Sequence, residues 1–334
     1  MYHPRLYGGF YEMGHKYGAL LHKNKVSLPE MTKSRSDFGA GCYEELRHFY
    51  PELIKEVRGF ADGMQIKEAL LGAFIAGLAV YDDSAKCSVF AFRNQSSTVV
   101  GRNYDMLYEF KKITESSLIA PEGKYAYISQ SDLFIGRSDG MNEHGLFVAM
   151  AFVNGTVIQP GITFHFVIRK VLDNCSTVEE SIKVIREAKV TSANNFLLAD
   201  KSGHMAVVET APQATTVRRP EGGENFLYIT NEFKTKKMMP FDKGGIAWSK
   251  TTERNQALYD RLKSAREIDV EQAKSILADK CVCLDLKKEK FGTIWSLAAD
   301  LNTLKLERAE GRPTMKNFKP DTRLDWWLKR RERK

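Results

Sequence analysis

The chain has 334 residues, of which 43% are hydrophobic and 28% are charged. This length accommodates one large domain or two ordinary ones, and the composition is that of a globular protein. The five cysteines are scattered, with only Cys281 and Cys283 close together, so they indicate neither a disulfide framework nor a CxxC metal site. The first residues lack the apolar segment of a signal peptide, and the longest uncharged apolar run, residues 69–81, is too short to span a bilayer. We therefore expect a soluble, cytoplasmic protein without a metal or other cofactor.

The formal net charge of +8 raises the question of a nucleic-acid partner. Residues 316–334 carry eight Lys and Arg side chains against three Asp and Glu, which leaves only about +3 on the rest of the chain. A solvated basic tail accounts for this excess without any bound polyanion. We expect no nucleic-acid or membrane partner, and we retain a polyanion-binding protein that acts through the tail as the competing function from another class.

The first 80 or so residues have a mainly helical pattern. Apolar residues at helical spacing predict helices over residues 43–60, with Pro51 as a break, and over residues 67–81. The period changes at Cys87, where two β-rich runs, residues 87–92 and 97–104, flank a turn at residues 93–96. This change predicts a helical leader followed by a β-hairpin.

The rest of the chain alternates pairs of strands with pairs of helices. A hairpin is expected over residues 124–153, and a helix over 164–174 precedes a second helix that begins with a capping box of Thr177 and Glu180. Two more hairpins are expected over residues 194–211 and 214–231. They precede two helices, over 252–265 and 270–278, of which the second is capped by Asp269, and a last hairpin over 292–310. This order predicts antiparallel sheets that are covered by helices.

Cys87 stands at the head of the first predicted strand. If Asn94 and Gln95 form a two-residue loop, Cys87 lies directly across the hairpin from Arg102, with the two Cβ atoms about 5 Å apart. A guanidinium there would favour the thiolate and lower the pKa of Cys87 below its free value of about 8.5. Asp105 follows three residues after Arg102, beyond the end of the Cys87 strand, where the pleat does not fix the direction of its side chain, so a return to the start of that strand is left open.

Several motifs occur in an order that is typical of one family. They are Gly9-Phe10-Tyr11-Glu12-Met13-Gly14 with Tyr17-Gly18, Cys87, Gly101-Arg102-Asn103-Tyr104-Asp105, residues 139–146 (DGMNEHGL), Thr230-Asn231, and Arg254 in SKTTER. Each motif is weak alone, but together they cover nearly the whole chain. The sequence resembles the cysteine N-terminal nucleophile (Ntn) hydrolases. Within them it is more similar to the self-processing acyltransferases typified by acyl-CoA:6-aminopenicillanic acid acyltransferase than to choloylglycine hydrolase and penicillin V acylase.

The resemblance implies a fold and a division of the chain. The implied fold is α+β, a four-layer αββα sandwich of two antiparallel sheets flanked by helices, preceded by a mainly helical prosegment. Residues 1–86 would be the prosegment, cut off between Lys86 and Cys87 and retained as a small subunit. Residues 87–315 would be the catalytic domain and residues 316–334 the basic tail. Lys86 departs from the glycine that precedes the nucleophile in the fungal acyltransferase.

The resemblance also implies roles for individual residues. Cys87 would be the nucleophile and, once cleaved, would supply its own base, because an α-amine has a pKa of about 7.7 to 8.0. Arg102 and Asp105 match the pair that holds the nucleophile and its amine. The side-chain amide of Asn231 and the main-chain N–H of Phe152 match the two oxyanion donors, and Arg254 matches a second arginine of the active site.

The expected activity is hydrolysis of a linear, non-peptide amide in a small-molecule N-acyl substrate, through a thioester at Cys87. The alternative is an acyltransferase that moves an acyl group, for example from acyl-CoA, to an amine. The sequence does not choose between them, and a homo-oligomer is compatible with both.

The same residues also have simpler structural interpretations. A lone cysteine in a strand is usually a small buried residue, Asn231 could cap the segment after it, and DGMNEHG forms a competent turn without any function. A papain-like partner for Cys87 would have to be His144, His165 or His204, of which His144 and His204 fall in predicted turns. Cys42, Cys175, Cys281 and Cys283 are expected to be structural.

Overall fold

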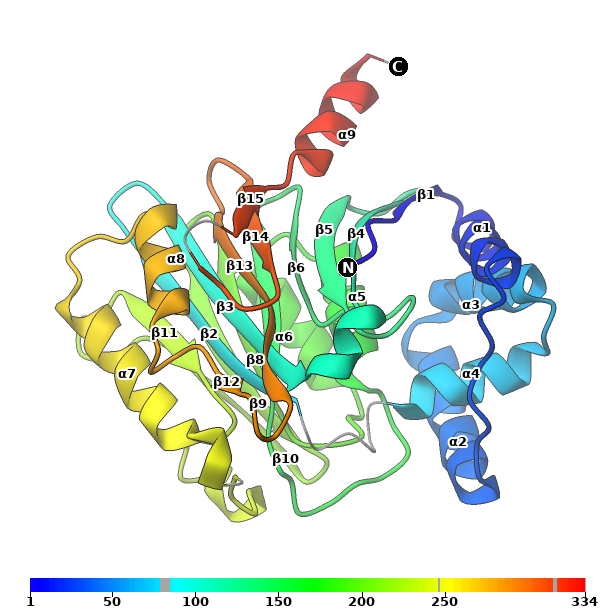
Figure 1. Cartoon of the computed structure of the whole chain (residues 1–334), viewed down its shortest axis with the longest axis horizontal. Coiled ribbons are helices and arrows are strands. Elements are labelled where there is room, and N and C mark those ends of the chain that lie inside the picture. Colours follow the sequence, from blue (N-terminus) through cyan, green and yellow to red (C-terminus); the bar gives the residue numbers. More distant parts are fainter. Residues whose placement is uncertain (79–84, 246, 315–316, 334) are drawn as a thin grey trace.

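The structure is a computed structural model that describes residues 1–78, 85–245, 247–314 and 317–333. In these ranges two β-sheets lie face to face, with helices on the outer face of each (Figure 1). This arrangement is the predicted four-layer αββα sandwich. A separate group of helices from the first 78 residues packs against one end of it (Figure 1).

The first sheet, of eight strands, has the order β1-β4-β5-β6-β7-β8-β9-β10. Its strands are β1 (Arg5–Gly8), β4 (Glu115–Pro121), β5 (Tyr127–Ser131), β6 (Asp139–Asn142), β7 (Leu146–Phe152), β8 (Asn194–Asp200), β9 (Met205–Ala211) and β10 (Ala214–Arg218). All neighbours are antiparallel except β1 and β4, which run parallel. The leader therefore contributes a strand to the catalytic sheet, and this pair departs from the purely antiparallel sheets that were expected.

The second sheet has the order β11-β2-β3-β13-β14-β15, with the short β12 also paired to β13. Its strands are β2 (Lys86–Arg93), β3 (Thr98–Leu107), β11 (Phe226–Ile229), β12 (Asp285–Leu286), β13 (Phe291–Asp300), β14 (Lys305–Glu310) and β15 (Phe318–Pro320). Nearly every residue of β2, β3 and β13 is buried, because one face meets the other sheet and the other face meets helices. The strand that carries Cys87 thus lies inside the sandwich.

The outer helices come from the predicted helix pairs. Helices α5 (Phe164–Asn174) and α6 (Val178–Glu187) cover the first sheet, and α7 (Thr251–Ser264) and α8 (Val270–Ala278) cover the second. Both capping boxes form, at Thr177 with Glu180 and at Asp269 with Gln272. The last helix, α9 (Arg323–Glu332), follows β15 and projects from the end of the sandwich (Figure 1).

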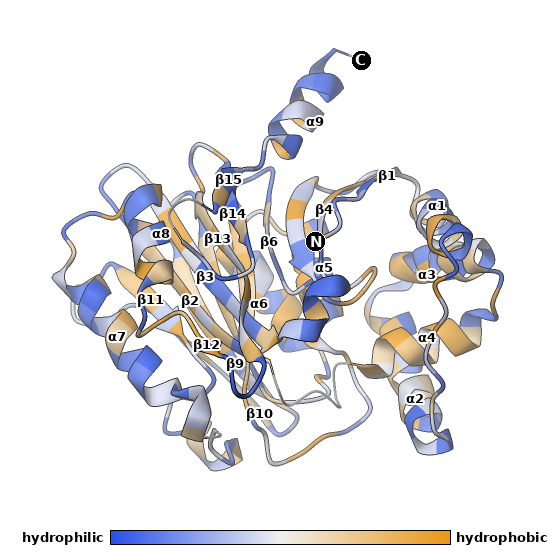
Figure 2. Ribbon diagram, viewed as in Figure 1, coloured by the Kyte–Doolittle hydropathy of each residue, from blue (hydrophilic) through white to orange (hydrophobic). Residues whose placement is uncertain are grey.

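The leader consists of β1 and four helices, α1 (Phe10–Lys23), α2 (Lys33–Phe49), α3 (Pro51–Met64) and α4 (Glu68–Gly77). Pro51 ends one helix and begins the next, as predicted, because proline is tolerated in the first turn of a helix. The apolar faces of the leader helices join the main core, and orange segments gather where the leader meets the sandwich (Figure 2). The end of the predicted helix over residues 67–81 lies outside the described residues.

Three local predictions were wrong. The expected hairpin over residues 124–153 is a three-stranded meander, because residues 139–142 form β6 between β5 and β7. Strands β10 and β11 do not pair with each other, since β10 continues the first sheet and β11 lies beside β2 in the second. Cys281 is exposed, whereas Cys42, Cys175 and Cys283 are buried as expected.

Candidate active site

The hairpin of β2 and β3 places Cys87 across from Tyr104 instead of Arg102. The predicted register was wrong by two residues because the connection is a four-residue turn, closed by the Asn94 N–H donating to the Ser97 carbonyl at 2.8 Å. Side chains on a strand alternate with a period of two, so a shift of two residues keeps Arg102 on the same face as Cys87. Arg102 is therefore a diagonal neighbour of Cys87.

The Cys87 thiol is fully buried and contacts this arginine. Arg102 Nη2 donates to Cys87 Sγ at 3.6 Å. Burial raises the pKa of the Cys87 thiol above its usual value, and the charge and hydrogen bond of Arg102 offset only part of this effect. We expected Arg102 to lower the pKa of Cys87. In the intact chain the pKa is raised instead, because the effect of desolvating the sulfur is larger than the effect of the guanidinium charge.

Arg102 is held in place by residues that the sequence analysis did not assign to the site. Its Nη1 forms a buried ion pair with Asp139 and donates to the Ser138 carbonyl at 2.7 Å. Asp139 also accepts from Trp295 Nε1 at 3.0 Å, and the Trp295 ring stacks on Tyr104 at 3.9 Å between centroids. Asp139 thereby fixes the charge that faces the Cys87 thiol.

Asp105 lies opposite Lys86 in the register, and Lys86 directly precedes Cys87. It accepts a hydrogen bond from Thr293 Oγ1 at 2.5 Å, while its Oδ2 has no hydrogen-bond partner among the described residues. Burial raises the pKa of Asp105 to about 6, against the opposing charge of Arg254. Asp105 does return to the start of the Cys87 strand, which the sequence had left open.

Asn231 and Arg254 converge on the backbone of Cys87. The main-chain N–H of Cys87 donates to Asn231 Oδ1 at 3.0 Å, and Arg254 Nη2 donates to the same oxygen at 2.9 Å. Arg254 Nη1 donates to the Cys87 carbonyl at 2.5 Å and to Ser88 Oγ at 3.0 Å. Asn231 follows β11, which pairs with β2, so the sheet order brings it to Cys87.

Phe152 is the last residue of β7 and lies beside Asn231. The Phe152 carbonyl accepts from Asn231 Nδ2 at 2.8 Å, and the same amide reaches the Ala85 carbonyl at 3.5 Å. We expected the side-chain amide of Asn231 to donate to an oxyanion. In the intact chain it donates to main-chain carbonyls instead.

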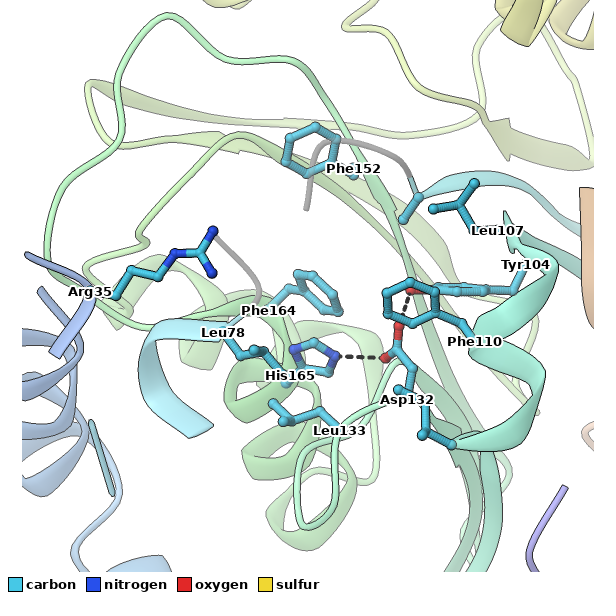
Figure 3. A pocket seen from close by; sticks show the side chains of 12 residues that line it. Arg35, Leu78, Tyr104, Leu107, Phe110, Asp132, Leu133, Phe152, Phe164 and His165 are labelled. Carbon is cyan, nitrogen blue, oxygen red and sulfur yellow. Dashed lines mark hydrogen bonds and ion pairs between the residues drawn. The ribbon is translucent and has the colours of Figure 1, made fainter. Parts of the chain in front are cut away.

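A cavity of about 290 Å³ lies near Cys87, which is not itself one of its lining residues. Its wall includes Phe152 and Tyr104 (Figure 3), and Tyr104 is the partner of Cys87 across the hairpin. Three of its lining residues, Arg35, Leu78 and Ala85, come from the segment before Cys87. The other residues that line it are Leu107, Phe110, Ile113, Asp132, Leu133, Phe164 and His165. The wall is mainly apolar and aromatic, which suits a small organic group.

In the part of the chain that the structure describes, no histidine is hydrogen-bonded to Cys87. His144 lies in a turn and His204 directly follows one, while His165 lines the cavity and its imidazole is hydrogen-bonded to Asp132. Among the described residues, no group of three or more His, Cys, Asp and Glu side chains is placed to hold a metal ion. The same part of the chain contains no helix that is long and apolar enough to cross a membrane.

The comparisons with known proteins agree with this geometry. Residues 92–315, more than half of the chain, match the model of the acyl-coenzyme A:6-aminopenicillanic acid acyl-transferase family. The chain belongs to this family of Ntn enzymes. The chain is also similar to a β-alanyl-dopamine/carcinine hydrolase of Drosophila melanogaster. The two sequences are 24% identical over 240 residues, and this alignment covers 60% of the chain. The chain spans 62% of the length of that relative.

The fold is shared with solved structures of the same superfamily. Two variants of conjugated bile acid hydrolase from Clostridium perfringens superpose with a TM-score of 0.50 at 16% identity, over 67% of this chain and 89% of theirs. Penicillin V acylase from Agrobacterium tumefaciens has a TM-score of 0.45 at 16% identity, over 67% and 83% of the two chains.

Proposed function

We propose that the protein is a self-processing amidohydrolase that cleaves a linear N-acyl compound through a thioester at Cys87. The observation that carries this proposal is the position of the thiol, 3.6 Å from Arg102 Nη2 and across the hairpin from Tyr104, which lines a mainly apolar cavity. Six side chains or main-chain groups that match family positions meet at this point: Cys87, Arg102, Asp105, Phe152, Asn231 and Arg254. Their convergence from distant parts of the sequence supports one common role.

The first step is cleavage of the chain itself. Cys87 Sγ attacks the Lys86 carbonyl, the peptide C–N bond breaks, and the main-chain nitrogen takes the thiol proton. Water then hydrolyses the resulting thioester, which leaves a carboxylate on Lys86 and a free α-amine on Cys87. Asn231 Oδ1 already accepts from this nitrogen, so it is placed to hold the new amine. Before cleavage the nitrogen is an amide and cannot act as a base.

The second reaction uses the freed amine. The α-amine of Cys87 removes the thiol proton, and the sulfur attacks the carbonyl carbon of the substrate amide. Asn231 Nδ2 exchanges the Phe152 carbonyl for the developing oxyanion, and the main-chain N–H of Phe152 supplies the second donor. The leaving amine takes the proton, and water hydrolyses the thioester.

The relatives bear on the class of substrate. The name of the Drosophila relative describes hydrolysis of amides of small amines, and that of the solved neighbours describes bile-acid conjugates. We therefore propose a small N-acyl amine as the substrate. The second candidate is transfer of an acyl group, for example from acyl-CoA, to an amine, and the family name supports it.

The polyanion-binding alternative has less support in the structure. Several cations of the segment 316–334 are already paired with carboxylates, namely Arg323 with Asp321, Lys329 with Asp325 and Arg331 with Glu143. Replacing the exposed Lys329 and Arg331 with glutamine is expected to leave amidase activity unchanged. If the protein were a polyanion binder, the same double variant would lose salt-sensitive binding to a polyanion.

Denaturing gels with N-terminal sequencing test the proposal. The wild-type chain is expected to give fragments of about 10 and 28 kDa, from about 110 Da per residue, with the larger beginning Cys-Ser-Val-Phe. The Cys87→Ala variant is expected to stay whole and inactive. A matched control is Cys42→Ala, which changes another buried cysteine far from the site in sequence. A wild-type protein that stays whole and still hydrolyses amides would refute the α-amine mechanism.

A further inference from the structure

Besides the exposed Arg35, the wall of the cavity near Cys87 carries two polar side chains that the proposed reaction does not use, Asp132 and His165. They lie together, and the His165 Nε2 to Asp132 Oδ1 distance is 3.0 Å (Figure 3). His165 is 4% exposed, and its Nδ1 is a buried atom without a hydrogen-bond partner among the described residues. A buried polar atom without a partner is costly, so this nitrogen indicates a missing ligand group.

Asp132 orients the imidazole of His165. Asp132 Oδ2 accepts from the Tyr104 hydroxyl at 2.6 Å, and Oδ1 also accepts from Ser138 Oγ at 3.1 Å. Burial alone would raise the pKa of Asp132, but the hydrogen bond and charge of His165 and the hydrogen bond of Tyr104 hold it below its ordinary value. An ionised carboxylate only accepts hydrogen bonds, so the His165 Nε2–H donates to Asp132, and Nδ1 is the nitrogen left for a ligand.

The missing partner of Nδ1 limits the ligand. The oxygens of Asp132 already have three donors, so within the described part of the chain Nδ1 is the atom of this pair that lacks a hydrogen bond. An ammonium group or a carboxylate would lose the hydration of its charge against a mainly apolar wall. A hydroxyl group has no charge and both donates and accepts, so it matches Nδ1.

The rest of the wall indicates what carries the hydroxyl. Four aromatic residues, Tyr104, Phe110, Phe152 and Phe164, line the cavity with Leu107, Ile113 and Leu133. Its volume of about 290 Å³ lies at the lower end of ligand pockets, which run from about 300 to 1,000 Å³. Flat apolar walls of this size suit a single aromatic ring.

We propose that His165 is a specificity-determining residue that binds the hydroxyl of a hydroxylated aromatic group on the substrate. This inference rests on the proposed function, because it assigns the cavity beside Cys87 to the substrate of that reaction. Asp132 is a positioning residue that orients the imidazole, and Tyr104 links the pair to the strand opposite Cys87.

Direct binding tests the proposal without turnover. The Cys87→Ala protein is titrated with 4-hydroxyphenylacetamide and with phenylacetamide, which differ by one hydroxyl. We expect roughly tenfold tighter binding of the hydroxylated probe, as one well-placed hydrogen bond provides. Adding His165→Phe should abolish this difference, with little change for phenylacetamide. Leu133→Ala on the same wall is the control and should weaken both probes by the same factor.

Each other result has a defined meaning. Equal binding of the two probes to the Cys87→Ala protein, or a preference that survives His165→Phe, would overturn the proposal. Tighter binding of 4-carboxyphenylacetamide or 4-(aminomethyl)phenylacetamide would overturn the choice of a hydroxyl. If His165→Phe does not fold by circular dichroism, His165→Gln replaces it, because an amide retains a hydrogen bond to Asp132 but lacks the imidazole Nδ1.

Turnover separates this proposal from the proposed function. Wild-type protein is assayed with the 4-nitroanilides of 4-hydroxyphenylacetic and phenylacetic acids. Loss of the binding preference together with intact hydrolysis would refute only the role of His165. Intact hydroxyl-dependent binding without any hydrolysis by a cleaved chain would refute the amidohydrolase and leave the binding site standing.

Discussion

Asp105 is a fully buried carboxyl group whose pKa is raised to about 6. A carboxyl that ionises less readily in the folded chain than in the unfolded chain stabilises the fold at low pH, and this stability is lost as the pH rises through the folded pKa. In a Cys87→Ala background, we expect the free energy of unfolding to fall between about pH 4 and pH 7. From the difference from an ordinary value of 3.8, the loss is about 3 kcal/mol. Urea titrations across this range measure it.

The Asp105→Asn variant isolates this titration, because asparagine keeps an oxygen for Thr293 and has no charge to lose. Its free energy of unfolding is expected to vary less than that of the parent over the same range. Asp325→Asn, at an exposed helix position, is the matched control and should follow the parent. Parallel curves for Asp105→Asn and the parent would contradict the assignment of a raised pKa.

Asp139 is predicted to control the arginine that faces the nucleophile. In Asp139→Asn the buried Arg102 charge loses its carboxylate partner, which should lower the free energy of unfolding by about 3 kcal/mol. We also expect cleavage before Cys87 to slow by at least about tenfold, because Arg102 is no longer oriented toward the sulfur. A time course of cleavage on denaturing gels measures the rate. Unchanged cleavage in a folded variant would show that the orientation of Arg102 is not needed.

The residues of the site were predictable to different degrees. Cys87, Arg102, Asp105, Asn231 and Arg254 could be named from motif order, and the structure brings them together around one backbone segment. Asp139 was read as part of a turn, because DGMNEHG has the composition of one. Its partner Arg102 lies 37 positions away, and no local pattern reveals such a pairing.

At the scale of elements, α1 and α3 of the leader pack through glycines. A Cβ added at Gly14 or Gly18 would lie 2.0 or 2.2 Å from a main-chain oxygen of α3, and one at Gly59 would lie 2.1 Å from the Tyr11 carbonyl of α1. Such contacts cannot be relieved by rotating a side chain. These glycines therefore allow the two helices to approach closely.

We predict that Gly59→Ala destabilises the protein by about 2 kcal/mol, because the helices must separate to admit the methyl group. Thermal unfolding of the variant and its parent, each in the Cys87→Ala background, measures the change. Gly245→Ala is the control, since an added Cβ there meets its nearest atom at an ordinary 3.4 Å. Equal losses in the two variants would mean that the packing of α1 on α3 is not limiting.

The elements themselves were easier to predict than their pairing. Helical and alternating periods identified α5, α7, α8 and most strands, because each period reports one buried face. The partner of a strand depends on distant chain, so β10 and β11 were joined although they belong to different sheets. The register of β2 and β3 failed because the length of the turn cannot be read from its composition.

At the scale of the whole molecule, buried polar contacts join the segment before Cys87 to the sandwich that follows it. Glu56 of α3 forms a fully buried ion pair with Arg169 of α5 at 2.7 Å, and the Tyr50 hydroxyl donates to Asp173 at 2.6 Å. Strand β1 pairs with β4 inside the first sheet. These contacts form one continuous interface between the segment before Cys87 and the segment after it.

We therefore predict that residues 1–86 stay bound after cleavage before Cys87. The two fragments should co-elute in gel filtration, also at 1 M NaCl, because buried ion pairs are screened much less than exposed ones. Glu56→Gln removes one of the buried carboxylates that pair with Arg169. We expect this variant to release the small fragment at a lower urea concentration than wild type, because a buried charge is then less well paired. Glu52→Gln is the matched control on the same helix. Its pair with Lys124 crosses the same interface, but the Glu52 side chain is 46% exposed, so its loss should change little. Separate elution of the wild-type fragments in buffer alone would mean that the buried contacts of the intact chain do not survive the cut.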